Sequence, residues 1–280
     1  MNYSHWYKYG DELLAEIRDT EVFPGSIAIW FFGQAGFALK AGRVVVYIDP
    51  YFNEGKNPDG TSKRRFPPPF APDCVDHADY VLCTHKHSDH LDPYTLTGIA
   101  SASPDAKFIV PAPHRAVLID GGIDESSIIG AFDNRAITLE KCGIIPNGCP
   151  HGVFETDEYG NHLHMGYAIN MGGICVYHSG DTVEWPEMRP MLKSRGIDVI
   201  LLPINGRDWE RDRKGIIGNL NSRESAYIGA ECADLTIPMH HDLFEGNSEN
   251  PAHFVHYMHQ YHKSKKYKIM VPGERFIYVK

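Results

Sequence analysis

Thr84-His85-Lys86-His87-Ser88-Asp89-His90 places three imidazoles and a carboxylate within six consecutive positions. This motif directly follows the apolar run Tyr80-Val81-Leu82-Cys83, which predicts a buried strand. Imidazole nitrogens and carboxylate oxygens are ligands that suit zinc, manganese and iron(II). A polar loop that is rich in His by chance is the alternative interpretation. The ordered HxHxDH pattern at the end of a strand favours a metal site instead.

Length and composition describe an ordinary globular chain. Its 280 residues can bury a sizeable core, and we expect one domain over residues 1–280. The net charge of −9 argues against a nucleic-acid-binding protein and against binding to an anionic membrane. The six Cys form no CxxC pair, and no apolar run approaches the roughly 20 residues that span a bilayer. We therefore expect a cytoplasmic protein with reduced thiols.

The periodicity of the chain predicts strands that first pair locally and then alternate with helices, twice over. The expected helices are 11–18, 92–100, 113–118, 185–193, 222–232 and 251–262, and the expected strands are 27–32, 37–40, 43–48, 80–83, 107–110, 137–145, 163–170, 174–177, 199–204, 235–239, 267–271 and 275–279. This order predicts two sheets flanked by helices. Residues 51–72, rich in Pro, Gly and basic residues, predict a long surface loop that either forms a wall of the substrate pocket or is disordered.

Neighbouring residues of one loop cannot all converge on a single tetrahedral ion. We therefore interpret HxHxDH as two half-sites, in which His85 and His87 face one ion while Asp89 and His90 face a second ion nearby. Each ion then needs further ligands from other parts of the chain. Three candidates follow predicted strands: His151, Asp181 and His240.

Two of these candidates have competing interpretations. Asp181 follows Gly180 and could be a turn residue instead. His162 and His164 lie near His151 and could replace it as a ligand. Because the two alternate with Leu163 in a predicted strand, we expect them to form one exposed or half-buried face.

The order of these motifs resembles the metallo-β-lactamase superfamily. HxHxDH is followed by a His, by Ser179-Gly180-Asp181-Thr182 after a strand, and by a His after another strand, and the resemblance extends over most of the chain. It implies an α/β fold, a four-layer αββα sandwich with one or two metals between the sheets. Within this superfamily, the stretches Thr84–Asp92, Tyr177–Asp181 and Ile237–Asp242 are similar to the L-ascorbate-6-phosphate lactonase family.

Carried over position by position, the resemblance implies a first ion held by His85, His87 and His151, a second held by Asp89, His90 and His240, and Asp181 as the bridge. Two divalent ions are expected; manganese is implied by the family, whereas the ligand chemistry favours zinc. His241 and Asp242 follow the last ligand and could orient it, contact substrate or, for His241, transfer a proton. His178 could face the site or be structural. Arg207 could bind a phosphate, although a charge run of this kind is usually a solvated loop.

The reaction that this site predicts is hydrolysis by a metal-bound hydroxide. The resemblance implies a lactonase that acts on a small anionic substrate, a phosphorylated sugar lactone, with Asp89, Asp181 and His241 as candidate catalytic groups. A phosphodiesterase or other ester hydrolase on the same fold is the first alternative. A non-catalytic metal-dependent binding protein is the second. The chain could also form a homo-oligomer.

Overall fold

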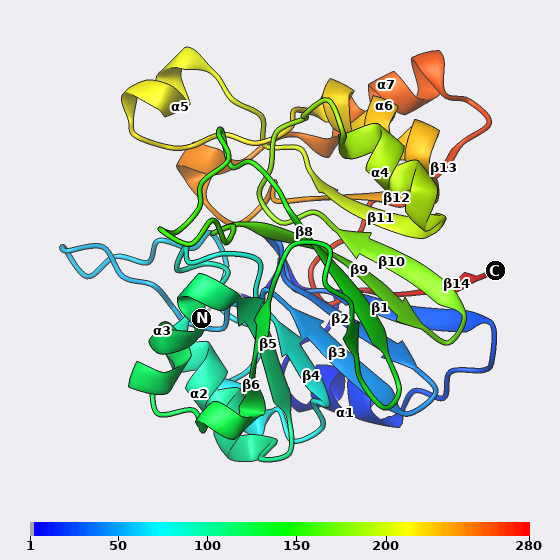
Figure 1. The fold of residues 1–280 in the computed structure, drawn as a ribbon. Coiled ribbons are helices and arrows are strands. Elements are labelled where there is room, and N and C mark those ends of the chain that lie inside the picture. The colour runs from blue at the N-terminus through cyan, green and yellow to red at the C-terminus, as the bar shows by residue number, and fades with distance from the viewer. Residues whose placement is uncertain (1–2) are drawn as a thin grey trace.

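The computed structural model describes residues 3–280, whose strands form two mixed sheets of seven strands each (Figure 1). The first sheet has the order β14-β1-β2-β3-β4-β5-β6, with β1 Ser26–Phe31, β2 Phe37–Ala41, β3 Val44–Ile48, β4 Tyr80–Leu82, β5 Lys107–Pro111, β6 Ile128–Ala131 and β14 Arg275–Val279. The second has the order β13-β12-β11-β10-β9-β8-β7, with β7 Ile137–Thr138, β8 Gly143–Gly148, β9 Met165–Met171, β10 Ile174–His178, β11 Ile197–Pro203, β12 Ala233–Met239 and β13 Lys266–Tyr267.

Helices cover the outer face of each sheet, as Figure 1 shows. Those beside the first sheet are α1 Gly10–Asp19, α2 Pro93–Ala102 and α3 Arg115–Asp120; those beside the second are α4 Met188–Arg195, α6 Ser222–Cys232 and α7 Pro251–Tyr261. The short helix α5, Trp209–Arg213, lies in the loop after β11. Within residues 3–280, none of the helices has the length and apolar character needed to cross a bilayer.

Alternation along the strands builds the layers. Ile27, Ile29 and Phe31 of β1 point into the apolar cluster between the sheets, whereas Ala28 and Trp30 belong to the cluster under α1 and α2. Successive side chains of a strand point to opposite faces, so a strand buried on both faces carries apolar residues at every position. The arrangement is the predicted αββα sandwich.

Local sequence signals fix the segments that flank the metal loop. Asp92 caps α2, because its carboxylate accepts a hydrogen bond from the backbone N–H of Thr95 (3.0 Å), and Pro93 occupies the first turn. The loop 84–91 is therefore held between the end of β4 and a well-capped helix. α6 begins with a reciprocal capping box formed by Asn221 and Glu224.

Two predicted strands differ clearly from the structure, and one further strand, β6, lies where none is predicted. The single strand predicted over 137–145 is a hairpin of β7 and β8, because the polar pair Glu140-Lys141 lies in a turn closed by the Leu139 N–H and the Cys142 carbonyl (2.9 Å). Of the strand predicted over 267–271, only Tyr267 pairs, as part of β13. β6 was not predicted, since Ile128–Ala131 is short and contains a glycine.

The loop 51–72 extends from the body of the molecule, drawn in light blue in Figure 1. Its tip contains an isolated antiparallel bridge between Lys56 and Ser62. The buried guanidinium of Arg64 attaches its base by donating to the carbonyls of Tyr51 (2.8 Å), Asn53 (3.2 Å) and Phe66 (3.0 Å). The base of the loop is thus ordered against the domain. All six Cys are free thiols, and five of them are buried.

Candidate metal centre

The seven predicted ligands meet at one edge of the sandwich, each on a loop that follows a strand. They follow β4 (His85, His87, Asp89, His90), β8 (His151), β10 (Asp181) and β12 (His240). Their ligand atoms form two groups, and within each group all atoms lie within 4.8 Å of one another. The first group is His85, His87, His151 and Asp181, and the second is Asp89, His90 and His240. Apart from Asp181, the expected bridge, which is grouped here with His85, His87 and His151, the grouping follows the two predicted half-sites.

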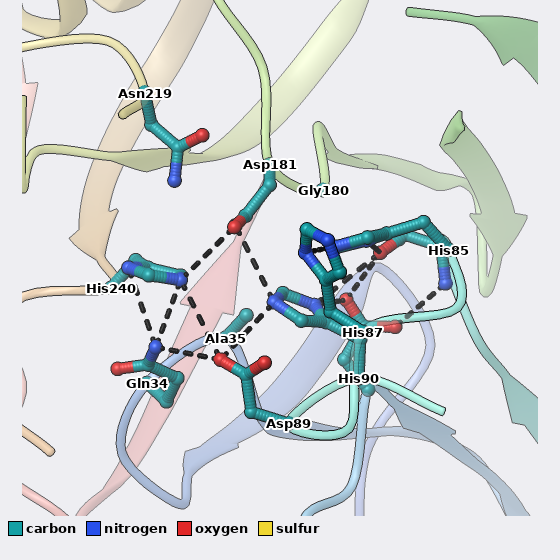
Figure 2. A network of polar contacts seen from close by, with 12 residues as sticks. Gln34, Ala35, His85, His87, Asp89, His90, Gly180, Asp181, Asn219 and His240 are labelled. Carbon is teal, nitrogen blue, oxygen red and sulfur yellow. Dashed lines mark hydrogen bonds and ion pairs between the residues drawn. The ribbon is translucent and has the colours of Figure 1, made fainter. Parts of the chain in front are cut away.

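Asp181 of the first group also faces the second group, and Figure 2 shows its carboxylate between His240 and His90. Its Oδ2 lies 3.1 Å from Nε2 of His240 and 3.7 Å from Nε2 of His151, while its Oδ1 lies 3.5 Å from Nε2 of His90. A carboxylate in this position offers an oxygen to each half-site. The carboxylate is therefore placed where a bridging ligand would be needed.

Several polar atoms of the centre are buried without a hydrogen-bond partner in the part of the chain that the structure describes. They are Nε2 of His90, both ring nitrogens of His151, Oδ1 of Asp181 and Oε1 of Gln34. A buried polar atom without a partner costs roughly 1–3 kcal/mol, so native proteins rarely leave such atoms in a cluster. Neutral imidazoles and carboxylates are ligands of divalent cations such as zinc and manganese. The residues present therefore fit a metal centre.

The two half-sites differ in electrostatics. Burial lowers the pKa of His85 well below its ordinary value and also lowers the pKa of His87 and His151. Burial alone would do the same to His90 and His240, but nearby carboxylates, that of Asp181 first, raise the pKa of both. The imidazoles of the first half-site are therefore neutral and ready to bind a cation. At the second half-site, a cation would displace the protons that His90 and His240 hold more tightly.

Asp49 is a residue of the centre that the sequence interpretation missed. It is fully buried, and its Oδ2 accepts hydrogen bonds from Nδ1 of His90 (2.7 Å) and from Oγ1 of Thr84 (2.7 Å). The bond fixes the ring of His90 so that Nε2 faces Asp181 and Asp89. A signal existed, because Ile48-Asp49-Pro50 ends β3, which pairs in parallel with β4, so both strands deliver their ends to the same edge.

Gln34 is a second missed residue. Its side chain is 1% exposed, and Nε2 lies 2.8 Å from Oδ2 of Asp89 and 2.8 Å from Nε2 of His240 (Figure 2). Gly33-Gln34-Ala35-Gly36 forms the turn between β1 and β2. Nothing in that local pattern indicates a contact with Asp89, 55 positions away, or with His240, 206 positions away.

His164 differs from its expectation. It is 3% exposed, and its ring centroid lies 5.1 Å from that of His85 and 5.4 Å from that of His151. Burial, and then the charge of His151, lowers the pKa of His164 to about 3. The predicted exposed or half-buried face is wrong for His164, because Met165 N–H bonds to the Thr84 carbonyl (2.9 Å) and so packs this segment against the metal loop. His162 is half-buried.

The other predicted site residues surround the centre without joining it. Nε2–H of His178 donates to the Ala35 carbonyl (2.9 Å), and its Nδ1 accepts from Gly180 N–H (3.1 Å), which leaves neither nitrogen free for substrate. His241 is buried against the ring of Phe31, with ring centroids 6.1 Å apart. Neither imidazole makes a hydrogen bond or ion pair to the seven ligands within residues 3–280.

Asp242 and Arg207 also have partners outside the seven. Oδ1 of Asp242 accepts the backbone N–H of Gln34 (2.8 Å). Arg207 donates through both terminal nitrogens to the carboxylate of Glu224 (2.7 and 2.6 Å) and through Nη1 to the Asn219 carbonyl (2.9 Å). An anionic substrate would have to displace Glu224, so these contacts disfavour the predicted role of Arg207.

Comparison with known proteins agrees with this geometry. Residues 45–241 match the family model described as beta-lactamase superfamily domain. The chain is 28% identical over 246 residues to a UPF0173 metal-dependent hydrolase of Methanoculleus marisnigri (86% of this chain, 92% of the relative). It is 26% identical over 290 residues to the probable L-ascorbate-6-phosphate lactonase UlaG of Shigella boydii (87% and 77%). Igni18, a metallo hydrolase from Ignicoccus hospitalis, superposes with a TM-score of 0.68 at 22% identity (90% and 98%) and shares the fold. The chain therefore belongs to the metallo-β-lactamase superfamily of metal-dependent hydrolases.

Proposed function

We propose that this hydrolase cleaves a carboxylic ester bond in a small anionic molecule, with a phosphorylated sugar lactone as the substrate class. The observation that carries the proposal is the convergence of seven imidazole and carboxylate side chains into two adjacent groups bridged by Asp181. Similarity to a probable L-ascorbate-6-phosphate lactonase supports the lactone, although a UPF0173 hydrolase is equally similar.

The proposed centre holds two divalent ions, manganese or zinc. His85, His87 and His151 would hold the first, Asp89, His90 and His240 the second, and Asp181 both. When bound, two such ions supply hydroxide near neutral pH and polarise a carbonyl oxygen.

Asp89 is the proposed proton carrier of the chain itself. Its Oδ2 accepts the hydrogen bond from Gln34 (2.8 Å), whereas its Oδ1 forms no hydrogen bond with residues 3–280. The side chain is 17% exposed, so Oδ1 can hold a proton and return it to the leaving oxygen. We assign this step to Asp89 rather than to His241, because the ring of His241 packs on Phe31 in the interior.

The charge of Lys86 is a further argument for an anionic substrate. It is exposed in the metal loop between two ligands, and its charge contributes to the lowered pKa of His87. Its ammonium group makes no ion pair or hydrogen bond within the described chain, in contrast to the guanidinium of Arg207, which pairs with Glu224. A phosphate or carboxylate of the substrate would complement this cation.

The test combines metal content and turnover. Wild-type protein, Asp181→Ala and His240→Ala would each be loaded with Mn²⁺ or Zn²⁺, dialysed, and assayed on a phosphorylated sugar lactone, its unphosphorylated form and a phosphodiester. His253→Ala is the control, because His253 lies exposed on α7 and pairs with Glu249 (2.8 Å). We expect both ligand variants to lose metal and lactone hydrolysis together, and the control to lose neither.

Three results would contradict the proposal in different ways. Full metal content with unchanged turnover in both variants would exclude the assigned ligands. Hydrolysis of the phosphodiester alone would identify a phosphodiesterase. Tight metal binding without hydrolysis of any substrate would favour a binding protein.

A further inference from the structure

Gln34 is clamped by its backbone to the loop that carries His240. Its carbonyl accepts the backbone N–H of His240 (2.6 Å), and its N–H donates to Oδ1 of Asp242 (2.8 Å). Gln34 and His240 both have left-handed backbone, with φ of 55° and 57°. For a residue other than glycine this conformation costs on the order of 1–3 kcal/mol and is typical of functional sites. The first sheet thus delivers Gln34 to a ligand of the second sheet.

The side chain of Gln34 lies at the atoms that would hold the second ion. Its Nε2 donates to Oδ2 of Asp89 (2.8 Å) and lies 2.8 Å from Nε2 of His240. The amide N–H groups therefore engage a lone pair of Asp89 and face Nε2 of His240, which are the atoms that a cation would use. Its Oε1 is buried and has no partner within residues 3–280.

A cation and these N–H groups cannot occupy the same lone pairs. A rotation of the Gln34 side-chain amide by half a turn about its terminal torsion exchanges Oε1 and Nε2. It places Oε1 toward Asp89 and His240. The exchange needs no backbone movement, because the terminal torsion of Gln has two broad minima. It would also give the orphaned oxygen a partner, and buried amide oxygens are nearly always satisfied.

We propose that Oε1 of Gln34 is a further ligand of the second ion and makes this half-site prefer Mn²⁺ over Zn²⁺. The proposal rests on the two-ion centre described above. The first half-site offers three imidazoles and one carboxylate. The second would offer two imidazoles with oxygens from Asp89, Asp181 and Gln34. Carbonyl and carboxylate oxygens suit manganese, whereas imidazole nitrogens suit zinc.

The test is a titration of metal-free protein with Mn²⁺ or Zn²⁺, read as the number of ions bound and the affinity of each. Gln34→Met removes the oxygen at nearly constant volume, and Gln34→Glu replaces the amide by a carboxylate. Asn147→Ala is the matched control, since Asn147 is a buried amide (3% exposed) with an unpartnered oxygen in the described chain, bound to the Tyr177 hydroxyl outside the centre.

We expect Gln34→Met to bind the first ion as wild type does and to lose roughly 10- to 100-fold in Mn²⁺ affinity at the second half-site, with a smaller loss for Zn²⁺. Gln34→Glu should bind the second Mn²⁺ more tightly than wild type, which tests the proposal even if Gln34→Met does not fold. Asn147→Ala should match wild type.

Two results would overturn the proposal and can be told apart. Unchanged affinity for the second Mn²⁺ in both Gln34 variants would exclude Oε1 as a ligand and leave the two-ion centre intact. A single Mn²⁺ bound by wild-type protein would exclude the two-ion centre itself.

Discussion

Three of the four non-glycine residues with left-handed backbone in the described chain belong to the candidate centre. They are Gln34, Asp49 and His240, with φ of 55°, 44° and 57°. Asp49 and His240 adopt this conformation directly after β3 and β12, and Gln34 adopts it in the turn between β1 and β2. The centre therefore rests on backbone conformations that the surrounding hydrogen bonds must stabilise.

Asp49 gives the first prediction at this scale. In the wild-type protein, Oδ2 of Asp49 accepts hydrogen bonds from Nδ1 of His90 and Oγ1 of Thr84. Asp49→Asn can replace this acceptor by an NH₂ donor. We expect the affinity for the second ion to fall roughly 10- to 100-fold, because an imidazole ligand loses the group that orients it. Metal titration measures the loss. Asp79→Asn is the control, since Asp79 accepts the Val45 N–H (2.8 Å) and does not touch the centre; equal losses in both variants would contradict the role of Asp49.

His77 predicts a pH effect on stability away from the centre. Burial lowers the pKa of His77, whose Nε2 accepts from the Tyr47 hydroxyl (2.8 Å). Below about pH 6.5 the unfolded chain protonates this residue more readily than the folded one does. The free energy of unfolding contributed by His77 is therefore present at higher pH and is lost as pH falls. We expect His77→Gln to lose less thermal stability than wild type between pH 7.5 and 5.5; equal slopes would contradict this.

Sequence reasoning predicted the seven side chains that converge at this edge and did not predict Gln34 and Asp49 beside them. His151, Asp181 and His240 could be predicted because each follows a strand in a motif of its own. Gln34 has no such signal, because its contacts with Asp89 and His240 reach across the fold, and Asp49 can be recognised only once β3 is placed beside β4. Short-range patterns predict which side chains reach an edge, whereas side-chain packing decides which of them touch.

At the scale of elements, the loop 51–72 depends on one buried cation. Arg64→Met removes the three bonds to the carbonyls of Tyr51, Asn53 and Phe66 and leaves those acceptors unsatisfied, at about 1–3 kcal/mol each. We expect the loop to open locally, so that proteinase K cleaves within it faster than in wild type. The exposed neighbour provides the control, since Arg65→Met should leave the cleavage rate unchanged. Equal rates in all three proteins would show that Arg64 does not fix the loop.

Gly229 tests the packing of α6 on β12. Glycine within a helix is usually about 1 kcal/mol less favourable than alanine, so Gly229→Ala would be expected to stabilise an isolated helix. Here a Cβ would overlap the side chain of Thr236 on β12. We therefore expect Gly229→Ala to lower the free energy of unfolding by roughly 1–3 kcal/mol, measured in denaturant. Adding Thr236→Ala should recover part of the loss; additive losses would contradict the overlap.

Element prediction succeeded where an apolar pattern was uninterrupted and failed where polar residues or a glycine interrupted it. The helix predicted over 222–232 and the strand over 275–279 match α6 and β14. The β7–β8 turn was missed because a two-residue polar interruption in an apolar run is ambiguous without its partner strand. The ends of such strands are set by hydrogen bonds to the partner strand, so they cannot be predicted from the local sequence alone.

At the scale of the whole molecule, the two halves of the chain each supply part of the centre. The first sheet carries the metal loop after β4, whereas the second carries His151, Asp181 and His240. The sequence predicted two sheets flanked by helices, and the order of the strands within each sheet comes from the structure. Ions bound here would join the two sheets at their shared edge.

Metal removal therefore predicts a change in the stability of the entire domain. Ions that bind only the folded state add RT ln(1 + [L]/Kd) to the free energy of unfolding, about 2.7 kcal/mol when the free ion is about 100 times its Kd. We expect the Tm of wild-type protein to rise with Mn²⁺ and to fall to the metal-free value after EDTA. Asp181→Ala provides the control, because loss of the bridge should abolish most of the response while leaving the fold.

Because the centre is buried, bound ions are expected to raise the Tm and not to lower it. The imidazole of His151 and Oδ1 of Asp181 are buried with no hydrogen-bond partner among residues 3–280, and each such group lowers the stability of the folded state. A bound ion satisfies these groups simultaneously and cannot do so in the unfolded chain, where they are far apart. A Tm that is identical with Mn²⁺, with Zn²⁺ and with EDTA would show that the two sheets are not coupled through this centre.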